Sequence, residues 1–134
     1  MKGRICSVGS ALVVLAASVS LFAHHSPSAI FEMSKRFTWS GVLTKVDWIN
    51  PHITVLMDVK TEDGKVEKWT FETNPPLWFK KVGVNRNDFA KFIGQNVSVE
   101  GVRPKDSASL YGYLYKITFP GGNSLELADG ENPR

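Results

Sequence analysis

The stretch ITVLMDVKTEDGKVEKWTFET, residues 53–73, predicts two β-strands joined by a tight turn, and the rest of the fold can be built outward from it. Apolar and polar residues alternate along both halves, which is the pattern of strands with one buried face. The side chains predicted to be buried are Ile53, Val55, Met57, Val59, Trp69 and Phe71. Asp63-Gly64 favours a hairpin turn between the halves, because glycine readily adopts the positive φ that such turns require.

A longer strand is predicted before this hairpin, from Arg36 to Ile49. Phe37 and Trp39 share one face of it, whereas the opposite phase is shared further on by Val42, Thr44, Val46 and Trp48. A change of phase at Gly41 predicts a β-bulge or a sharp bend at that glycine. Asn50-Pro51 then ends the strand, since proline has no N–H to donate to a sheet.

A short helical region is predicted after the hairpin. Asn74 is a candidate N-cap, and Pro75-Pro76 suits the first helical positions, where an N–H is not needed. The apolar side of this helix would be formed by Leu77, Trp78 and Val82, and Gly83 would end it. Asn87 would begin a further turn that carries Phe89, Phe92 and Ile93 and ends at Gly94.

Two strands follow the helical region, from Val97 to about Arg103 and from Tyr111 to Phe119, with a short additional strand at Ser124–Leu127. Three strands, a helix and two strands is the order of the OB-fold. We therefore expect a mostly β protein, an OB-like five-stranded Greek-key barrel with one helix between strands 3 and 4 and a small extra C-terminal strand. The barrel would occupy residues 36–128, between an extended arm at 24–35, with Phe31 as a candidate anchor, and a frayed tail at 129–134.

The N-terminal segment has the organisation of a signal peptide. Lys2 and Arg4 precede an uncharged run from Ile5 to Phe22, and Ala23 offers a cleavage site directly before His24. We expect residues 1–23 to be removed, although residues 15–18 offer earlier cleavage sites. The alternative is an uncleaved anchor, for which the apolar run is at the short end of what spans a bilayer. Cleavage would give a periplasmic protein with no membrane span.

Composition and charge exclude several classes of protein and partner. The 134-residue chain is 43% hydrophobic and 22% charged, which is typical of one globular domain and not of a disordered or multi-span membrane protein. A single cysteine excludes an internal disulfide framework and a cysteine-cluster zinc site. Loss of Lys2 and Arg4 with the signal would lower the formal net charge from +3 to +1, so we expect no nucleic-acid partner.

Several motifs occur in order along the chain: Ala23-His-His-Ser26, Gly41-Val-Leu-Thr-Lys-Val-Asp-Trp48, Ile49-Asn-Pro-His52, Trp69-Thr-Phe-Glu72 and Asn74-Pro-Pro76. This chain resembles a family of small exported bacterial proteins known as a domain of unknown function, and the Trp-Ile-Asn-Pro-His string is the most specific part of the likeness. The resemblance covers His24 to about Gly130 and implies an exported, periplasmic, single-domain protein. It implies no activity, so no catalytic residues are carried over.

Histidines are the strongest candidates for a functional site. His24, His25 and His52 all remain after the predicted cleavage. If His24 is the first residue, its α-amine and its imidazole can chelate one metal ion, and a nitrogen from His52 would complete a T-shaped set that suits Cu(II). His25 can replace His52 as a ligand, and Zn(II) is the less favoured metal.

Other side chains can support such a metal site, and simpler roles for the histidines remain open. Met33 and Met57 are candidates to assist Cu(I), and the carboxylate behind the histidine ligands would be Glu32, Asp47 or Asp58. Alternatively, His24 and His25 are solvated at the terminus, and the ring of His52 bonds to the backbone of a turn.

Aromatic side chains support a metal-free alternative. OB barrels bind oligosaccharides through aromatic faces, and the candidates for such a face are Trp39, Trp48, Tyr111 and Tyr113. The occupant would be a saccharide, a small ligand or a partner protein of the cell envelope. Catalysis has little support, because no nucleophile motif occurs and the only acid–base candidates are Asp47, Asp58, Glu72 and Glu100. We therefore expect a binding or accessory protein, not an enzyme.

Overall fold

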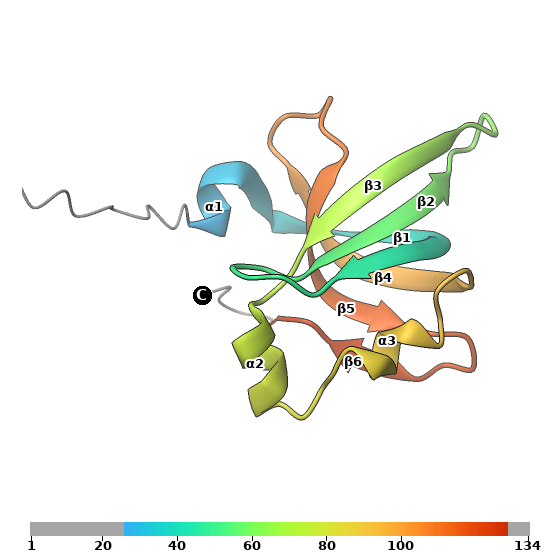
Figure 1. Ribbon diagram of the computed structural model, residues 1–134. Coiled ribbons are helices and arrows are strands. Elements are labelled where there is room, and N and C mark those ends of the chain that lie inside the picture. Colours follow the sequence, from blue (N-terminus) through green and yellow to red (C-terminus); the bar gives the residue numbers. More distant parts are fainter. Residues whose placement is uncertain (1–25, 129–134) are drawn as a thin grey trace, which may run out of the picture.

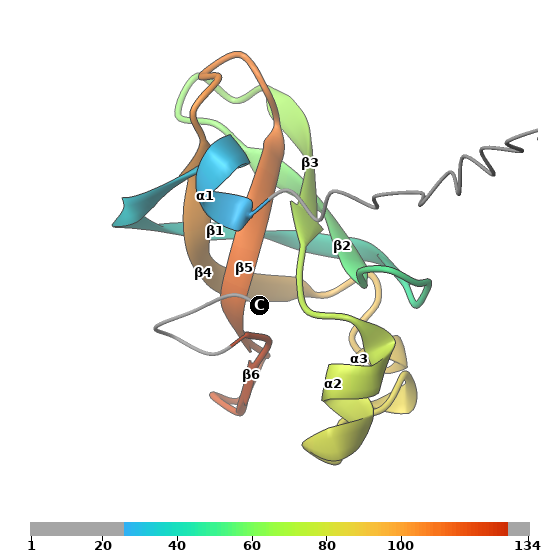
Figure 2. The same cartoon turned by 90° about the vertical axis from the view of Figure 1, so that its left-hand side faces the viewer.

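The computed structural model describes residues 26–128, which form six strands and three short helices (Figure 1). The strands are β1 (Phe31–Asp47), β2 (Thr54–Lys60), β3 (Val66–Glu72), β4 (Asn96–Pro104), β5 (Tyr111–Thr118) and β6 (Ser124–Glu126). The helices are α1 (Pro27–Ile30), α2 (Pro76–Lys81) and α3 (Asn87–Ala90). In both Figure 1 and Figure 2, α2 and α3 lie along the lower side of the barrel.

Five of the strands form a closed barrel. Antiparallel neighbours follow the order β3-β2-β1-β4-β5, and β3 also pairs with β5 in parallel, which closes the ring. The short β6 pairs with β5 outside the ring. The predicted OB-like Greek-key barrel with a small extra C-terminal strand is therefore confirmed, and the predicted helix and turn between strands 3 and 4 are α2 and α3.

The first strand bends, but not at the predicted position. Its register with β2 shifts between Leu43 and Lys45, so the bulge lies around Thr44 and not at Gly41. Leu43 is fully buried and continues the face of Trp39, because an apolar residue is available at 43 to keep the phase. Gly41 has a different role: a Cβ built there would lie 2.3 Å from the carbonyl oxygen of Asp58, so only glycine allows the two strands to approach this closely.

The main core fills the barrel. Every side chain that the hairpin pattern assigned to the core is buried, which confirms that part of the prediction: Ile53, Val55, Met57, Val59, Trp69 and Phe71. A second, smaller cluster contains Phe31, Val102, Tyr113, Tyr115 and Ala128. Strand β5 contributes to both clusters, since Leu114 and Ile117 belong to the main core while Tyr113 and Tyr115 belong to the second.

The beginning of the described chain packs against the barrel. Strand β1 starts at Phe31, five residues earlier than the Arg36 start expected from the sequence, and Pro27–Ile30 is helical. Phe31 is 1% exposed, and its ring lies 5.7 Å from Tyr113 and 5.9 Å from Tyr111 between ring centroids. Figure 2 shows α1 in front of β5, where this second cluster lies.

Helix α2 turns inward only part of the side that was predicted. Its buried residue is Phe79, and Trp78 is partly buried against the core as predicted, whereas Leu77 and Val82 are 62% and 51% exposed. Asn74 is not the N-cap, because that position is held by Pro75 and the side chain of Asn74 bonds to Tyr113 instead. Gly83 ends the helix with φ +76, as predicted. Within residues 26–128, no helix has both the length and the apolar content needed to cross a bilayer.

Replacement of the close-approach glycine tests the strand spacing. We expect Gly41→Ala to lower the free energy of unfolding by about 3 kcal/mol, because its methyl group overlaps the backbone of Asp58 and the strands must move apart. Urea denaturation followed by circular dichroism measures this, with Ser40→Ala, an exposed neighbour, as the control that should change stability by under about 0.5 kcal/mol. Equal stability of the two variants would contradict the assigned role of Gly41.

Candidate functional site

His52 lies just before β2, at the end of the barrel where the β1–β2 loop returns to the sheet. Its Nδ1 atom is 3.0 Å from the backbone carbonyl oxygen of Thr73 and 3.3 Å from Oε1 of Glu72. The β2–β3 pairing produces this contact, because Thr54 faces Glu72 and the ladder continues through Ile53 to Thr73 and Asn74. The imidazole is partly exposed, with its Nδ1 atom held by the protein.

These contacts determine which ring nitrogen carries the proton. A backbone carbonyl oxygen only accepts hydrogen bonds, so Nδ1 of His52 must be the donor to Thr73. In the neutral ring, Nε2 therefore holds the lone pair. No hydrogen bond or ion pair within the described residues occupies Nε2. The Nδ1 contacts thus fix the orientation of the ring and leave Nε2 as its unprotonated nitrogen.

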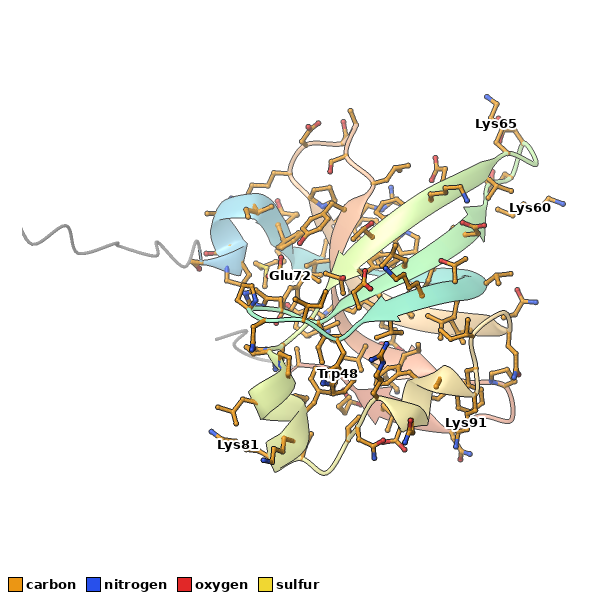
Figure 3. All side chains as sticks on the ribbon, in the orientation of Figure 1. Trp48, Lys60, Lys65, Glu72, Lys81 and Lys91 are labelled. Atoms are coloured by element: carbon orange, nitrogen blue, oxygen red, sulfur yellow. The ribbon has the colours of Figure 1, made fainter. Side chains whose placement is uncertain are left out.

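Glu72 connects His52 to the aromatic residues of β5. Its second carboxylate oxygen, Oε2, accepts a hydrogen bond of 2.6 Å from the hydroxyl of Tyr111. The parallel pairing of β3 and β5 brings the two side chains together, and Figure 3 shows Glu72 on the barrel side of the β1–β2 loop. Since Tyr111 in turn stacks on Phe31, a continuous set of contacts runs from the start of β1 to His52.

A buried polar pair lies next to this arrangement. The hydroxyl of Tyr113 donates a 3.1 Å hydrogen bond to Oδ1 of Asn74, and these residues are 1% and 3% exposed. Thr73 is also buried, and its hydroxyl bonds to the carbonyl of Ile53. Buried polar groups of this kind restrain their neighbours because breaking any one bond leaves an unsatisfied partner. They therefore fix the backbone that holds His52.

The tyrosines of this region are kept neutral. Burial raises the pKa of Tyr111 well above its usual value near 10, and the hydrogen bond to Glu72 and the charge of that carboxylate raise it further. Burial also raises the pKa of Tyr115, and the guanidinium of Arg36, 3.5 Å above its ring centre, opposes that effect. Tyr111 therefore remains a hydrogen-bond donor to Glu72 throughout the neutral pH range.

The structure locates one of the three predicted metal ligands. His24 and His25 lie outside the described residues, and only His52 can be located. Residues 26–128 contain no group of three or more His, Cys, Asp or Glu side chains arranged to hold a metal ion. A site with three such ligands that includes His52 would therefore need at least one ligand from outside residues 26–128. Met57 is a core residue, 1% exposed.

The carboxylate beside His52 is one that the sequence analysis did not select for this role. Glu32, Asp47 and Asp58 instead contact Ser34, Lys45 and Lys68 respectively. Glu72 was considered only as a candidate acid or base. The hairpin register contained the missing signal, because a turn at Asp63-Gly64 places Glu72 opposite Thr54, two residues after His52.

The remaining candidates for catalysis do not form a carboxylate pair. Asp47 is 2.7 Å from the ammonium of Lys45, and Asp58 is 3.1 Å from that of Lys68. Glu100 lies 4.0 Å from Lys116. Three of the four acidic candidates therefore face a lysine, and the fourth, Glu72, contacts His52 and Tyr111.

The four aromatic candidates do not share one exposed face. Trp39 and Tyr113 are 5% and 1% exposed, which makes them core residues. Trp39 packs on Trp69 and Phe71, whereas Trp48 packs on Phe79 of α2 and Phe89 of α3. Tyr111 is half-buried in the contacts described above. Trp48 lines a groove beside α2, and Trp39 lines a different hollow together with Trp69 and Arg103, so the two indoles do not share one surface.

Ionisation of Tyr111 lowers the free energy of unfolding at alkaline pH. Its folded-state pKa lies above the unfolded value, so its contribution is complete below about pH 10 and is lost as pH rises further. We expect Tyr111→Phe to cost about 1 kcal/mol at pH 8, where the bond to Glu72 is lost, and to flatten the decline of unfolding free energy above about pH 10. Parallel pH slopes in urea denaturation of the two proteins would contradict this.

Comparison with known proteins identifies a family. Residues 11–112 match the family described as "Family of unknown function (DUF6152)". No curated protein and no solved structure matches the chain significantly. The match includes β1 to β4, the helices and the first residues of β5, and therefore His52, Glu72 and Tyr111.

Proposed function

Since the chain belongs to the DUF6152 family, whose function is unknown, we propose a function from its own residues: an exported, periplasmic accessory protein that binds Cu(II) through His24, His25 and His52. The observation that carries this proposal is the orientation of His52. The protein binds the metal without transforming a substrate, since its candidate carboxylates are engaged by lysines or by the His52 contacts.

The surroundings of His52 are those of a metal-binding imidazole. Histidine ligands characteristically donate their second ring N–H to a carboxylate or a backbone carbonyl, which fixes the ring and makes it more basic. His52 has both partners, with Nδ1 at 3.0 Å from the Thr73 carbonyl and 3.3 Å from Glu72. Its Nε2 atom is then the ligand atom.

The other ligands come from the amino terminus that the predicted cleavage would create. Cleavage after Ala23 frees the α-amine of His24, which chelates together with its imidazole, and His25 offers a further nitrogen. Three nitrogen donors favour Cu(II) over Zn(II) in the order of divalent-metal affinities, so zinc is the weaker occupant. Support for their approach to His52 comes from the contacts that join Phe31 to Tyr111 and Tyr111 to Glu72.

Copper titration of the exported protein tests the site. We expect one tightly bound Cu(II) per chain, with nitrogen hyperfine structure in the electron paramagnetic resonance spectrum. His52→Ala should lower the affinity at least tenfold. A second variant carries one extra serine before His24. It keeps all three imidazoles but removes the chelate formed by the α-amine of His24, and it should also lose affinity. Intact mass spectrometry verifies the first residue, and binding that neither change affects would refute the proposal.

Glu72 is expected to act as a positioning residue. Glu72→Gln keeps the side-chain size but removes the charge beside Nδ1 of His52, so we expect copper affinity to fall by about tenfold. Glu100→Gln, which removes an exposed carboxylate of β4, is the control. A changed copper spectrum with unchanged unfolding free energy would separate positioning from a purely structural effect. Identical spectra and affinities in all three proteins would refute this role.

Copper affinity should also depend on pH. The α-amine, whose ordinary pKa is about 7.7–8.0, must lose its proton to bind, so affinity should rise between pH 6 and pH 8.5. Calorimetric titration at three pH values measures this rise, and the variant with the extra serine should show a smaller one. An affinity independent of pH would contradict amine ligation.

A further inference from the structure

A solvent-open groove lies between the two helices below the β1–β2 loop. Trp48 forms its floor, with ring centroids 5.4 Å from Phe79 of α2 and 5.9 Å from Phe89 of α3. The groove has a volume of about 560 Å³. Figure 3 shows Trp48 between α2 and α3, on the other side of the β1–β2 loop from Glu72. It is therefore separate from the surroundings of His52.

The walls of the groove are apolar. Leu77 of α2 and Val84 of the following loop line it together with Pro76, and Leu77 is 62% exposed. Ile49, which follows Trp48 in the chain, is 63% exposed. Such large aliphatic side chains are rarely gathered on a surface that contacts only water, and apolar hollows of this volume are typical of small-ligand sites.

The rim of the groove is cationic. Lys80 and Arg86 line it, and no carboxylate does. Neither cation has a carboxylate within 4.0 Å in the part of the chain that the structure describes. Arg86 also lines a second hollow of about 200 Å³, beside Phe89 and Ile93, so this residue lies between the two hollows. The site thus combines apolar walls with positive charge that is unmatched by acid.

We propose that this groove binds an amphipathic carboxylate, a molecule with an acidic head and an aliphatic tail. The planar guanidinium of Arg86 matches the two oxygens of a carboxylate, and Lys80 adds a second cation. The tail lies against Trp48 and Leu77, where it removes apolar surface from water. Asn50 and Asn85 also line the groove, but their amides are neutral, so the charge of the site favours an anionic head. This activity requires no metal.

Calorimetric titration of the metal-free, full-length exported protein with octanoate and with 1-octanol tests the site. Octanoate should bind more tightly than the alcohol, because only the acid uses the cations. Arg86→Gln should weaken octanoate binding at least tenfold and leave 1-octanol binding unchanged, whereas Leu77→Ser should weaken both. Arg103→Gln, a change of the same type on β4 outside the groove, is the control and should change neither.

Three outcomes would overturn the proposal. If octanoate produces no heat of binding, or binds equally well to the Arg86→Gln protein, the groove is not a carboxylate site. Alternatively, the protein could sediment with phosphatidylglycerol vesicles without binding free octanoate, and the apolar and basic surface would then belong to a bilayer contact. Thermal denaturation of each variant verifies that it is folded, so a loss of binding reports on the groove itself.

Discussion

The parallel contact between β3 and β5 is the constraint on which the rest of the structure depends. Glu72 pairs with Tyr113 and Phe71 pairs with Gly112, and these pairs close the sheet into a barrel. Gly112 permits the approach, because a Cβ there would lie 2.7 Å from the ring of Phe71. The same closure brings Glu72 to Tyr111 and, through the β2–β3 register, both of them to His52. Without this closure of the barrel, the hydroxyl of Tyr111 would not reach the carboxylate of Glu72.

The β1–β2 loop separates two surfaces with different chemistry. His52, Glu72 and Tyr111 lie on one side and combine a nitrogen base with a partly buried carboxylate and a neutral phenol. Trp48 lies on the other side, among aliphatic side chains and two cations. Both surfaces use residues of one short loop, since Asn50 lines the groove and His52 follows two positions later. This loop is therefore where changes in sequence would most directly alter either binding property.

Local patterns account for most of what could be predicted. The hairpin, its buried face and the strand order all follow from alternation and turn residues, so the barrel itself was predictable. The predictions were wrong where a local sequence pattern was compatible with two structures. Apolar residues at 42, 43 and 46 permit a bulge on either side of Leu43, and tertiary packing placed it near Thr44. Asn74 is a good N-cap by type, but the hydroxyl of Tyr113 holds its side chain.

By itself, the sequence determined that this chain forms an OB-like barrel and that His52 follows its first strand, because strand periodicity and turn chemistry act between neighbours along the chain. Tertiary structure alone decided that Glu72 also meets Tyr111, that Trp39 packs in the core while Trp48 packs on α2 and α3, and that Leu77 is exposed on the groove that Arg86 also lines. Those facts depend on contacts between residues far apart in the chain. Such contacts form only when separate strands and helices pack together, so no local pattern encodes them.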